Sequence, residues 1–439
     1  MLKSRSDIIF NHLARVAKAD WGLDSAAIKE IYRAVFIPKV TYAASVWHAA
    51  VDKVRNKRTL MTIQRHAALR LAKAFRTIST DALLVICGVM PLDLAIHEKA
   101  QHYRVRKGKT IRVGNDTFMM GSYCVKPTLS ELYSPPERLI ITEIDENIDG
   151  SIELYTDGSK SDKGVGAAFV VYVEGAERAF MQFKLDNNCT VFQAKLLALK
   201  EAVRYFVESL QDEQVTICTD SRTALDTLKQ YKDDNKMAID IKGMLKRCQG
   251  RGVIKFRWVK AHAGLVRNER ADALAKDAAD NESTDFNILP RAYIKKKIRD
   301  SMRKRWQVRW SDSTKGRNTY EILPNIEERL GELKWMSIDF VMTQMLSGHA
   351  KCNAYLHKIN KHPNDRCECG ADCQSIQHLI FQCSKYALLR HEMECVFMFN
   401  QPNTTMNLYH IIRNKDVYAE FRRLIGVIFK RTFGNRSYF

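Results

Sequence analysis

Apolar residues near the start of the chain recur at intervals of three and four, the repeat of a helix with one buried face. The pattern runs from about residue 24 to residue 108 and predicts an all-helical region. Its first helix carries apolar residues at Ile28, Ile31, Tyr32, Val35 and Phe36. Asp24 and Ser25 are both candidate caps, and Pro38 predicts the end of this helix.

A longer helix is predicted at roughly 53 to 75, after a short one through Ala43, Val46 and Trp47. Its basic residues surround the apolar positions Leu60 and Ile63. Such charges fit either a solvated face or a surface that contacts nucleic acid, and the pattern leaves both interpretations open.

The middle of the chain has a different pattern, in which short runs rich in β-branched residues alternate with helical repeats. Strands are predicted at 152–159, 164–173, 215–220 and 253–259, and helices at 190–208, 221–249 and 268–279. The first two strands suggest a hairpin. Strands that alternate with helices after such a hairpin indicate an α/β sandwich with a mixed sheet.

The stretch 290–312 is strongly basic and places Trp306 and Trp310 at helical spacing. Two interpretations are open: the tryptophans stack on bases while the basic residues neutralise phosphates, or they belong to the core of an amphipathic helix.

Charge and length narrow the possible partners. The 439 residues suggest two to four domains, and 70 lysines and arginines against 50 aspartates and glutamates leave a net charge of +20. This balance favours a polyanionic partner, nucleic acid first, and no dedicated protein partner is evident.

The sequence does not support export or membrane insertion. The start, MLKSRSDIIF, has no long apolar stretch, and the most apolar run, 82–92, is broken by Pro91. We therefore expect an intracellular protein of the nucleus or cytoplasm. Eleven cysteines, an odd number without an export signal, indicate free thiols or metal ligands rather than a disulfide framework.

Asp157 and Asp220 each stand at the end of an apolar strand, before a small polar residue. If these strands are neighbours, the two carboxylates meet at one end of the sheet, and Asp272 on the last helix can point to the same place. Clustered carboxylates repel one another unless cations lie between them, and two magnesium ions held by such a cluster suit phosphodiester hydrolysis. A single strand-end aspartate would carry no such meaning.

The segments YTDGS, CTDS and VKAHAGLVRNERADALAK, with the helix that contains AKLLAL, resemble the type 1 ribonuclease H family. The resemblance implies a mixed five-stranded sheet flanked by helices, and cleavage of the RNA strand of RNA:DNA hybrids with Mg²⁺ or Mn²⁺. Asp157, Asp220 and Asp272 fall on three of the four metal-binding positions of the family. His262 matches its mobile histidine, which implies a role in proton transfer or product release.

The fourth position of the family is a glutamate, and this chain has Lys195 there. Glu201 is a poor substitute, because six residues turn a helix by about 240°. At an effective dielectric constant near 20, an ammonium group against a divalent ion costs about 8 kcal/mol as an upper figure. The resemblance therefore leaves two hypotheses: a metal-dependent hybrid nuclease, or a catalytically impaired nucleic-acid-binding protein derived from a retrotransposon. A third option is that the lysine amine partly replaces a metal ion.

The flanking segments resemble non-LTR (LINE-type) retrotransposon polyproteins. IKEIYRAVFIPKVTYAASVWHAA and LMTIQRHAALRLAKAFRTIST are similar to the helical segment that follows the reverse-transcriptase palm. The chain has no YxDD or FxDD motif, so we expect no polymerase activity from it.

Cys367, Cys369, His378 and Cys383 have the spacing C-x-C-x8-H-x4-C, which suits a tetrahedral zinc ion. The motif resembles the knuckle-like CCHC motif of the same polyproteins, and such a site would be structural or grip single strands. Cys373 is a competing ligand, and unliganded thiols are the other interpretation.

These observations divide the chain into six predicted segments. They are a helical region resembling the segment after the palm (1–110), a connector (111–150), a ribonuclease H domain (151–282), a basic helical region (283–360), a zinc-knuckle-like region (361–390) and a basic helical tail (391–439).

Overall fold

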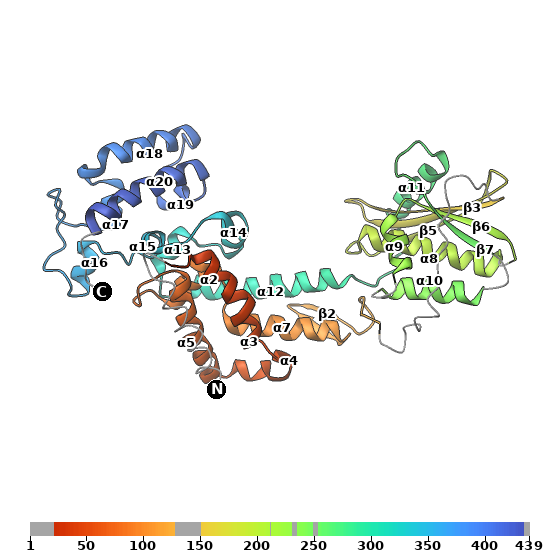
Figure 1. Ribbon diagram of the computed structural model, residues 1–439, viewed down its shortest axis with the longest axis horizontal. Helices are drawn as coiled ribbons and strands as arrows, with labels where there is room; N and C mark the ends of the chain where they lie inside the picture. Colours follow the sequence, from red (N-terminus) through yellow and green to blue (C-terminus); the bar gives the residue numbers. More distant parts are fainter. Residues whose placement is uncertain (1–21, 128–150, 211, 231–234, 249–252, 434–439) are drawn as a thin grey trace. The chain divides into compact units, whose positions relative to one another are not determined.

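The computed structural model describes residues 22–127, 151–210, 212–230, 235–248 and 253–433. Most of the predicted connector and both ends of the chain lie outside these residues. The chain forms two compact units (Figure 1). Gln101–Ile298 is called the sheet unit, and Met1–Ala100 with Arg299–Phe439 is called the helical unit.

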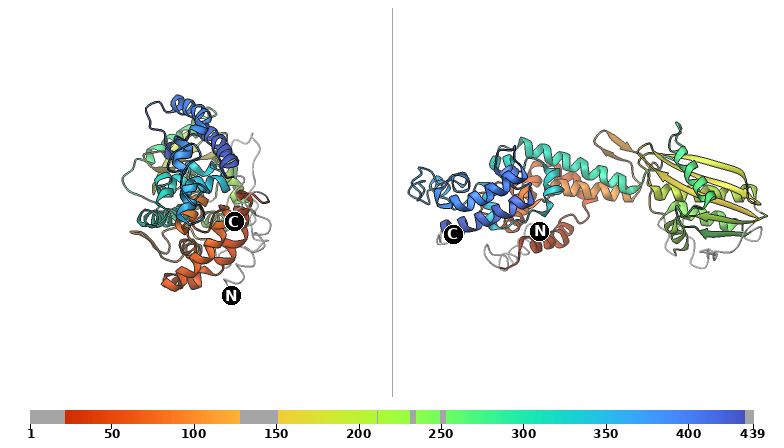
Figure 2. Two further views of the ribbon diagram at one scale, coloured as in Figure 1. Left: turned by 90° about the vertical axis from the view of Figure 1, so that its left-hand side faces the viewer. Right: turned by 90° about the horizontal axis from the view of Figure 1, so that it is seen from above.

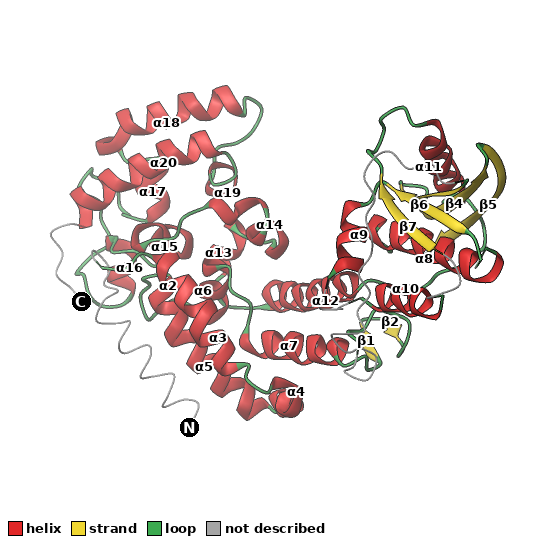
Figure 3. Cartoon of the chain, turned by 45° about the vertical axis from the view of Figure 1, so that its right-hand side comes forward, coloured by secondary structure: helices red, strands yellow, loops and turns green. Residues whose placement is uncertain are grey.

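Five strands of the sheet unit form one mixed sheet in the order β5-β4-β3-β6-β7 (Figure 3). They are β3 (Ile152–Lys160), β4 (Val165–Val173), β5 (Ala176–Leu185), β6 (Gln214–Thr219) and β7 (Val253–Trp258). β3, β4 and β5 are antiparallel neighbours, whereas β6 runs parallel to β3 and β7 parallel to β6. The predicted mixed five-stranded sheet is confirmed, and Figure 2 shows its twist in the strands coloured yellow to green.

Helices cover both faces of this sheet (Figure 1). α8 (Val191–Ser209) and α10 (Lys236–Arg247) lie on one face, and α11 (Val266–Ala278) lies on the other; α9 (Arg222–Lys229) follows β6. Side chains alternate between the two faces: Leu154 belongs to the core under α8, and Tyr155 to the core under α11. Asp157 has the same parity as Tyr155, which directs it to the side of the sheet that carries α11.

The sequence patterns located four of the five strands and missed β5. This edge strand is largely exposed over Ala176–Phe180, so its polar and apolar residues give no clean alternation. The turn before it, Glu174-Gly175, has φ of 49° and 82°. Positive φ at both residues is typical of a two-residue hairpin turn, but Glu-Gly signals such a turn more weakly than Asn-Gly or Asp-Gly.

Two glycines bring helices from opposite faces close to the sheet. A Cβ atom at Gly158 on β3 would overlap the backbone nitrogen of Lys195 on α8. A Cβ atom at Gly166 on β4 would overlap the carbonyl oxygen of Ala275 on α11. These two contacts fix where α8 and α11 stand relative to the ends of the strands.

Gly166→Ala is expected to destabilise the sheet unit by about 3 kcal/mol, because the methyl group meets backbone rather than a flexible side chain. Urea unfolding measures this change. Gly426→Ala, in the helix Lys415–Ile428, is the control. A Cβ at Gly426 meets nothing within 4 Å, so the free energy of unfolding is expected to rise by about 0.5–1 kcal/mol. A Gly166→Ala protein as stable as its parent would contradict the close packing of α11.

A small hairpin completes the sheet unit. β1 (Ile111–Val113) and β2 (Asp116–Phe118) pair antiparallel within the segment predicted as a connector. Their apolar residues pack with Val105 of α7 (Leu92–Arg106) and with Ile294 and Ile298 of α12 (Arg291–Asp312).

The helical unit is built from helices of the N-terminal and C-terminal parts of the chain. Besides α7 up to Ala100 and α12 from Arg299, its α-helices are α2 (Ser25–Ile31), α3 (Ile37–Val40), α4 (Ala44–Trp47), α5 (Val54–Leu71), α6 (Thr80–Cys87), α13 (Arg317–Ile322), α14 (Ile326–Leu330), α15 (Phe340–Ser347), α16 (Asn353–Lys358), α17 (Ile376–Phe381), α18 (Ala387–Asn400), α19 (Leu408–Ile411) and α20 (Lys415–Ile428). Single turns of other helical types are η1 (Tyr32–Phe36), η2 (His48–Asp52), η5 (Glu332–Trp335), η6 (Ser384–Tyr386) and η7 (Phe429–Phe433).

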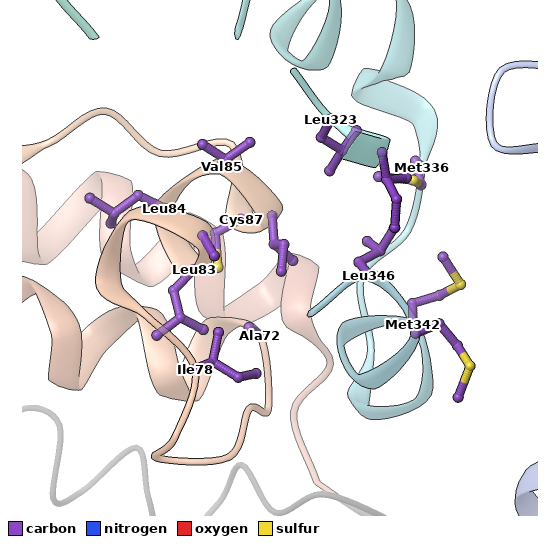
Figure 4. Packing of buried hydrophobic residues seen from close by; sticks show 14 of the residues in the cluster. Ala72, Ile78, Leu83, Leu84, Val85, Cys87, Leu323, Met336, Met342 and Leu346 are labelled. Atoms are coloured by element: carbon purple, nitrogen blue, oxygen red, sulfur yellow. The ribbon is translucent and has the colours of Figure 1, made fainter. Parts of the chain in front are cut away.

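One hydrophobic core joins the early and late helices of this unit. Leu83 and Cys87 of α6 belong to the same cluster as Leu323 and Leu346 (Figure 4). Arg329, 3% exposed, strengthens the connection by donating to the carbonyl oxygen of Ile86, 2.7 Å away, at the end of α6. The predicted helical regions 1–110 and 283–360 thus share one interior.

Trp306 and Trp310 lie in this core, with 2% and 1% of their surfaces exposed. The indole nitrogen of Trp310 donates to the carbonyl oxygen of Leu323, 2.8 Å away. Rings enclosed in this way cannot stack on bases, so the base-stacking interpretation of these tryptophans is wrong and the core interpretation holds.

Pro38 does not end the first helix, contrary to the prediction. Asp24 caps α2 by accepting from Ala27 N–H at 2.7 Å, and the chain then continues through the π-helical turn η1 into α3, which contains Pro38. The wider turn, in which Ile37 N–H donates to the Tyr32 carbonyl, precedes the proline and lets the helix absorb its missing donor.

Within the described part of the chain, no single helix has the length and apolar composition to cross a membrane; α6 and α7, bent by 56°, meet that test only as a pair.

Candidate active site

Asp157 and Asp220 lie side by side at one end of the sheet. Thr156 on β3 and Thr219 on β6 form the last register pair of these parallel strands, and each aspartate is the next residue. Both side chains are buried, with 5% and 6% exposed. Two contacts hold the short loop after β6. Ser221 caps α9, and the Trp258 indole nitrogen donates to the carbonyl oxygen of Asp220, 3.1 Å away.

Lys195 reaches both carboxylates from α8. Its Nζ lies 2.6 Å from each carboxylate oxygen of Asp220 and 2.9 Å from Oδ1 of Asp157. Only 19% of its side chain is exposed. The lysine therefore stands between the two carboxylates rather than pointing into solvent.

Two contacts hold the first turns of α8 in place and so fix the backbone position of Lys195. Thr190 and Gln193 form a reciprocal capping box, and Gly158 packs against the backbone at Lys195. Glu201, six residues further on, pairs with Arg204 at 2.5 Å instead. The position at which the resemblance implies a glutamate is thus occupied by a cation in direct contact with Asp157 and Asp220.

The electrostatics of the three groups agree with this arrangement. Burial lowers the pKa of Lys195, but its hydrogen bonds to Asp220 and its attraction to Asp157 outweigh burial, and the net pKa lies above the ordinary value. Burial raises the pKa of Asp157; Lys195 opposes this rise and the nearby Asp220 adds to it. Lys195 is therefore charged at neutral pH.

Asp272 lies on α11 and is paired with a second lysine. Lys276 Nζ, one turn along the helix, is 2.7 Å from Asp272 Oδ2, and Asp157 also acts on this ammonium group. The Lys276 side chain is 59% exposed, so this pair is readily opened. His262 is exposed in the turn between β7 and α11, with φ of 51°.

These residues do not fit a divalent ion between Asp157 and Asp220. Magnesium needs oxygen ligands at about 2.0–2.1 Å, and the Lys195 ammonium occupies the space in which both carboxylates would supply them. The sequence had placed Lys195 at the site, but its contact with both carboxylates was not predicted. Lys276 was missed, although its four-residue spacing from Asp272 is a recognisable signal.

The helical unit contains a second group of chemically suited side chains. One ligand atom each from Cys367, Cys369, His378 and Cys383 lies within 4.8 Å of the others. Cys367 and Cys369 sit in a tight turn closed by Gly370, whose φ is 95° and whose N–H donates to the Cys367 carbonyl at 3.0 Å. α17 supplies His378 and is followed by Cys383.

The distances in this group suit zinc. Zinc–sulfur bonds of 2.3 Å in a tetrahedron put two sulfurs about 3.8 Å apart, and the Cys367 and Cys383 sulfurs are 3.9 Å apart. The Ala371 backbone N–H and the neighbouring side chains lower the pKa of Cys369 to about 6, which favours the thiolate that binds metal. Cys373 is exposed and lies outside the group.

Comparison with known proteins locates the sheet unit in a family. The sequence model described as RNase H matches residues 149–280. A protein named Ribonuclease H from Pseudoalteromonas atlantica is 31% identical over 148 residues, which cover 30% of this chain and 92% of the relative.

Two other relatives come from retrotransposable elements. A "Putative 115 kDa protein in type-1 retrotransposable element R1DM" of Drosophila melanogaster is 37% identical over 107 residues, 24% of this chain and 10% of the relative. A "Retrovirus-related Pol polyprotein from type-1 retrotransposable element R1 2" of Nasonia vitripennis is 36% identical over 96 residues, 22% of this chain and 23% of the relative. The predicted kinship with retrotransposon polyproteins is confirmed, and the matches span a quarter or less of these two relatives.

Proposed function

Because this chain belongs to the ribonuclease H family, we propose that its sheet unit binds RNA:DNA hybrids and hydrolyses their RNA strand only slowly. The family membership and the net charge of +20 support nucleic-acid binding. Asp157, Asp220 and Asp272 are the candidate metal ligands of the family site, and His262 is its candidate mobile histidine.

The observation that carries slow turnover is the position of Lys195. Hydrolysis of a phosphodiester at a carboxylate cluster depends on positive charge held next to the attacking and leaving oxygens. The Lys195 ammonium contacts three carboxylate oxygens that would otherwise coordinate that charge. The fold accommodates Lys195, because its ammonium group is paired with both carboxylates and only 19% of its side chain is exposed. We therefore propose that binding persists where turnover is lost.

We also propose that Cys367, Cys369, His378 and Cys383 hold a structural zinc ion. The four ligand atoms lie close enough together, and two of the residues, Cys367 and Cys383, belong to the core of the helical unit. With four protein ligands such a site has no open position for a reacting water. Zinc at this place would stabilise the fold and not take part in hydrolysis.

A binding and cleavage assay on the full chain tests the main proposal. The chain is mixed with a fluorescent RNA:DNA hybrid, or with duplex DNA of the same sequence, at matched salt, and Kd is measured by anisotropy without added magnesium or manganese. Tighter binding of the hybrid than of the DNA duplex is expected, because only the hybrid presents 2′-hydroxyl groups. Equal affinity for the two duplexes would overturn hybrid recognition.

The same hybrid, labelled on the RNA strand, is then followed in magnesium and in manganese under single-turnover conditions. We expect the unmodified chain to leave most of the RNA intact under conditions in which a bacterial ribonuclease H completes the reaction. Rapid cleavage by the unmodified chain would contradict the proposal of slow hydrolysis but not the proposal of hybrid recognition.

A further inference from the structure

We infer that the Lys195 ammonium is the resident cation of this site, and that the sheet unit therefore takes up neither Mg²⁺ nor Mn²⁺ between Asp157 and Asp220. The inference deepens the proposed function and rests on it in one respect, that a divalent ion is what family members hold here. It concerns the protein without nucleic acid, and so it can fail or hold separately from hybrid recognition.

The contacts of Lys195 are those of a bridging ion. A single nitrogen touches both oxygens of Asp220 and one oxygen of Asp157, and all three side chains are at least four-fifths buried. A divalent ion and an ammonium group cannot share this space. For the ion to enter, Lys195 must leave.

Departure of Lys195 is opposed by the way α8 is anchored. Its first turn is capped by Thr190, and its backbone at Lys195 touches Gly158 of β3, so the helix cannot slide away from the sheet. The side chain alone would have to rotate out. That movement would leave two buried carboxylates side by side without the ammonium group that now contacts both.

The total charge of the site also disfavours a divalent ion. Asp157, Asp220 and Asp272 carry three negative charges, while Lys195 and Lys276 carry two positive charges, so the sum is −3 + 2 = −1. With a glutamate in place of Lys195, the sum would be −4 + 1 = −3. Affinity for hard cations rises with the number of charged oxygen ligands. With Lys195 in place, the site lacks both the space for a divalent ion and the negative charge to bind it.

Manganese binding in the absence of nucleic acid tests the inference. The zinc-loaded full chain is titrated with Mn²⁺, free Mn²⁺ is followed by electron paramagnetic resonance, and the midpoint of thermal unfolding is recorded at each concentration. Thiolates prefer zinc over manganese, so the cysteine cluster does not compete.

Three variants separate charge from shape. Lys195→Glu adds a ligand, Lys195→Met removes the charge and keeps the length of the side chain, and Lys195→Met with Asp220→Asn also removes a carboxylate. For the unmodified chain we expect no Mn²⁺ binding and no shift of the midpoint. Lys195→Glu should bind Mn²⁺ at least about tenfold more tightly than the unmodified chain.

Lys195→Met should have a lower midpoint without metal, because its carboxylates are unpaired, and should regain stability when Mn²⁺ is added. The double variant should show no such rescue. If the unmodified chain and Lys195→Glu bind Mn²⁺ equally, or if Mn²⁺ fails to raise the midpoint of Lys195→Met, the inference is wrong. Hybrid affinity measured without added magnesium or manganese is unaffected by either outcome.

Discussion

Lys195→Glu is expected to raise the single-turnover rate of RNA-strand cleavage by about 100-fold or more in magnesium, a size typical of gaining or losing one major electrostatic element of an active site. The substitution removes the ammonium from Asp157 and Asp220 and supplies the carboxylate that the resemblance to ribonuclease H implies at this position. Two effects therefore act together, because the space for a cation opens and a ligand is added.

The design of this experiment depends on its controls. Lys195→Gln removes the charge without adding a ligand and should recover only part of the rate, while Lys195→Arg keeps the charge and should recover none. Lys195→Glu combined with Asp157→Asn should lose the gain, which shows that the new activity belongs to this site and not to a contaminating nuclease. Cleavage that is equally slow in Lys195→Glu and in the unmodified chain, with hybrid binding intact, would refute the role given to Lys195.

Binding to the hybrid should change little in Lys195→Glu if the site chiefly affects the chemical step. Affinity for nucleic acid is set by many phosphate contacts spread over a basic surface, and one buried lysine paired with two carboxylates adds little to it. A rate gain at unchanged Kd would therefore separate catalysis from recognition.

The sheet unit was largely predictable from sequence because its strands and helices carry strong local patterns. Asp157 and Asp220 each follow an apolar strand, and adjacency of parallel strands then brings them together. β5 was not predicted, because an exposed edge strand has no buried face that requires polar and apolar residues to alternate. The lysine at the site was evident from AKLLAL, but its bridging geometry depends on the closeness of β3 and α8 at Gly158, which no local pattern encodes.

The helical unit was less predictable, since its organisation depends on contacts between distant segments. Leu83 and Leu346 are more than two hundred residues apart in sequence and share one core. At α12 the sequence left two interpretations open, base stacking by Trp306 and Trp310 or a place for them in the core. Those tryptophans are enclosed by partners from other segments, so their role was decided by tertiary packing and not by composition.

Cys383→Ser is expected to remove one equivalent of zinc from the purified chain and to lower the midpoint of thermal unfolding of the helical unit by about 10 °C or more. The size follows from two losses. A tetrahedral site with one ligand missing binds zinc far more weakly, and the free energy of metal binding is then no longer added to that of folding. The turn at Cys367 and Cys369 also loses its connection to the helix that carries His378.

Cys373→Ser is the matched control, because Cys373 lies in the same segment but is exposed and outside the group of four ligands. It should retain one equivalent of zinc, measured by mass spectrometry of the metal, and the midpoint of its parent. Hydrogen exchange should show faster exchange in Cys383→Ser at α17 and α20, which contact each other, and no change in the strands of the sheet unit. Full zinc content and an unchanged midpoint in Cys383→Ser would show that Cys383 is not a ligand and that this set of four is wrong, since a zinc site cannot lose a buried ligand without a measurable loss of affinity. Absence of zinc from the unmodified chain would show that the four side chains are free thiols and an ordinary histidine.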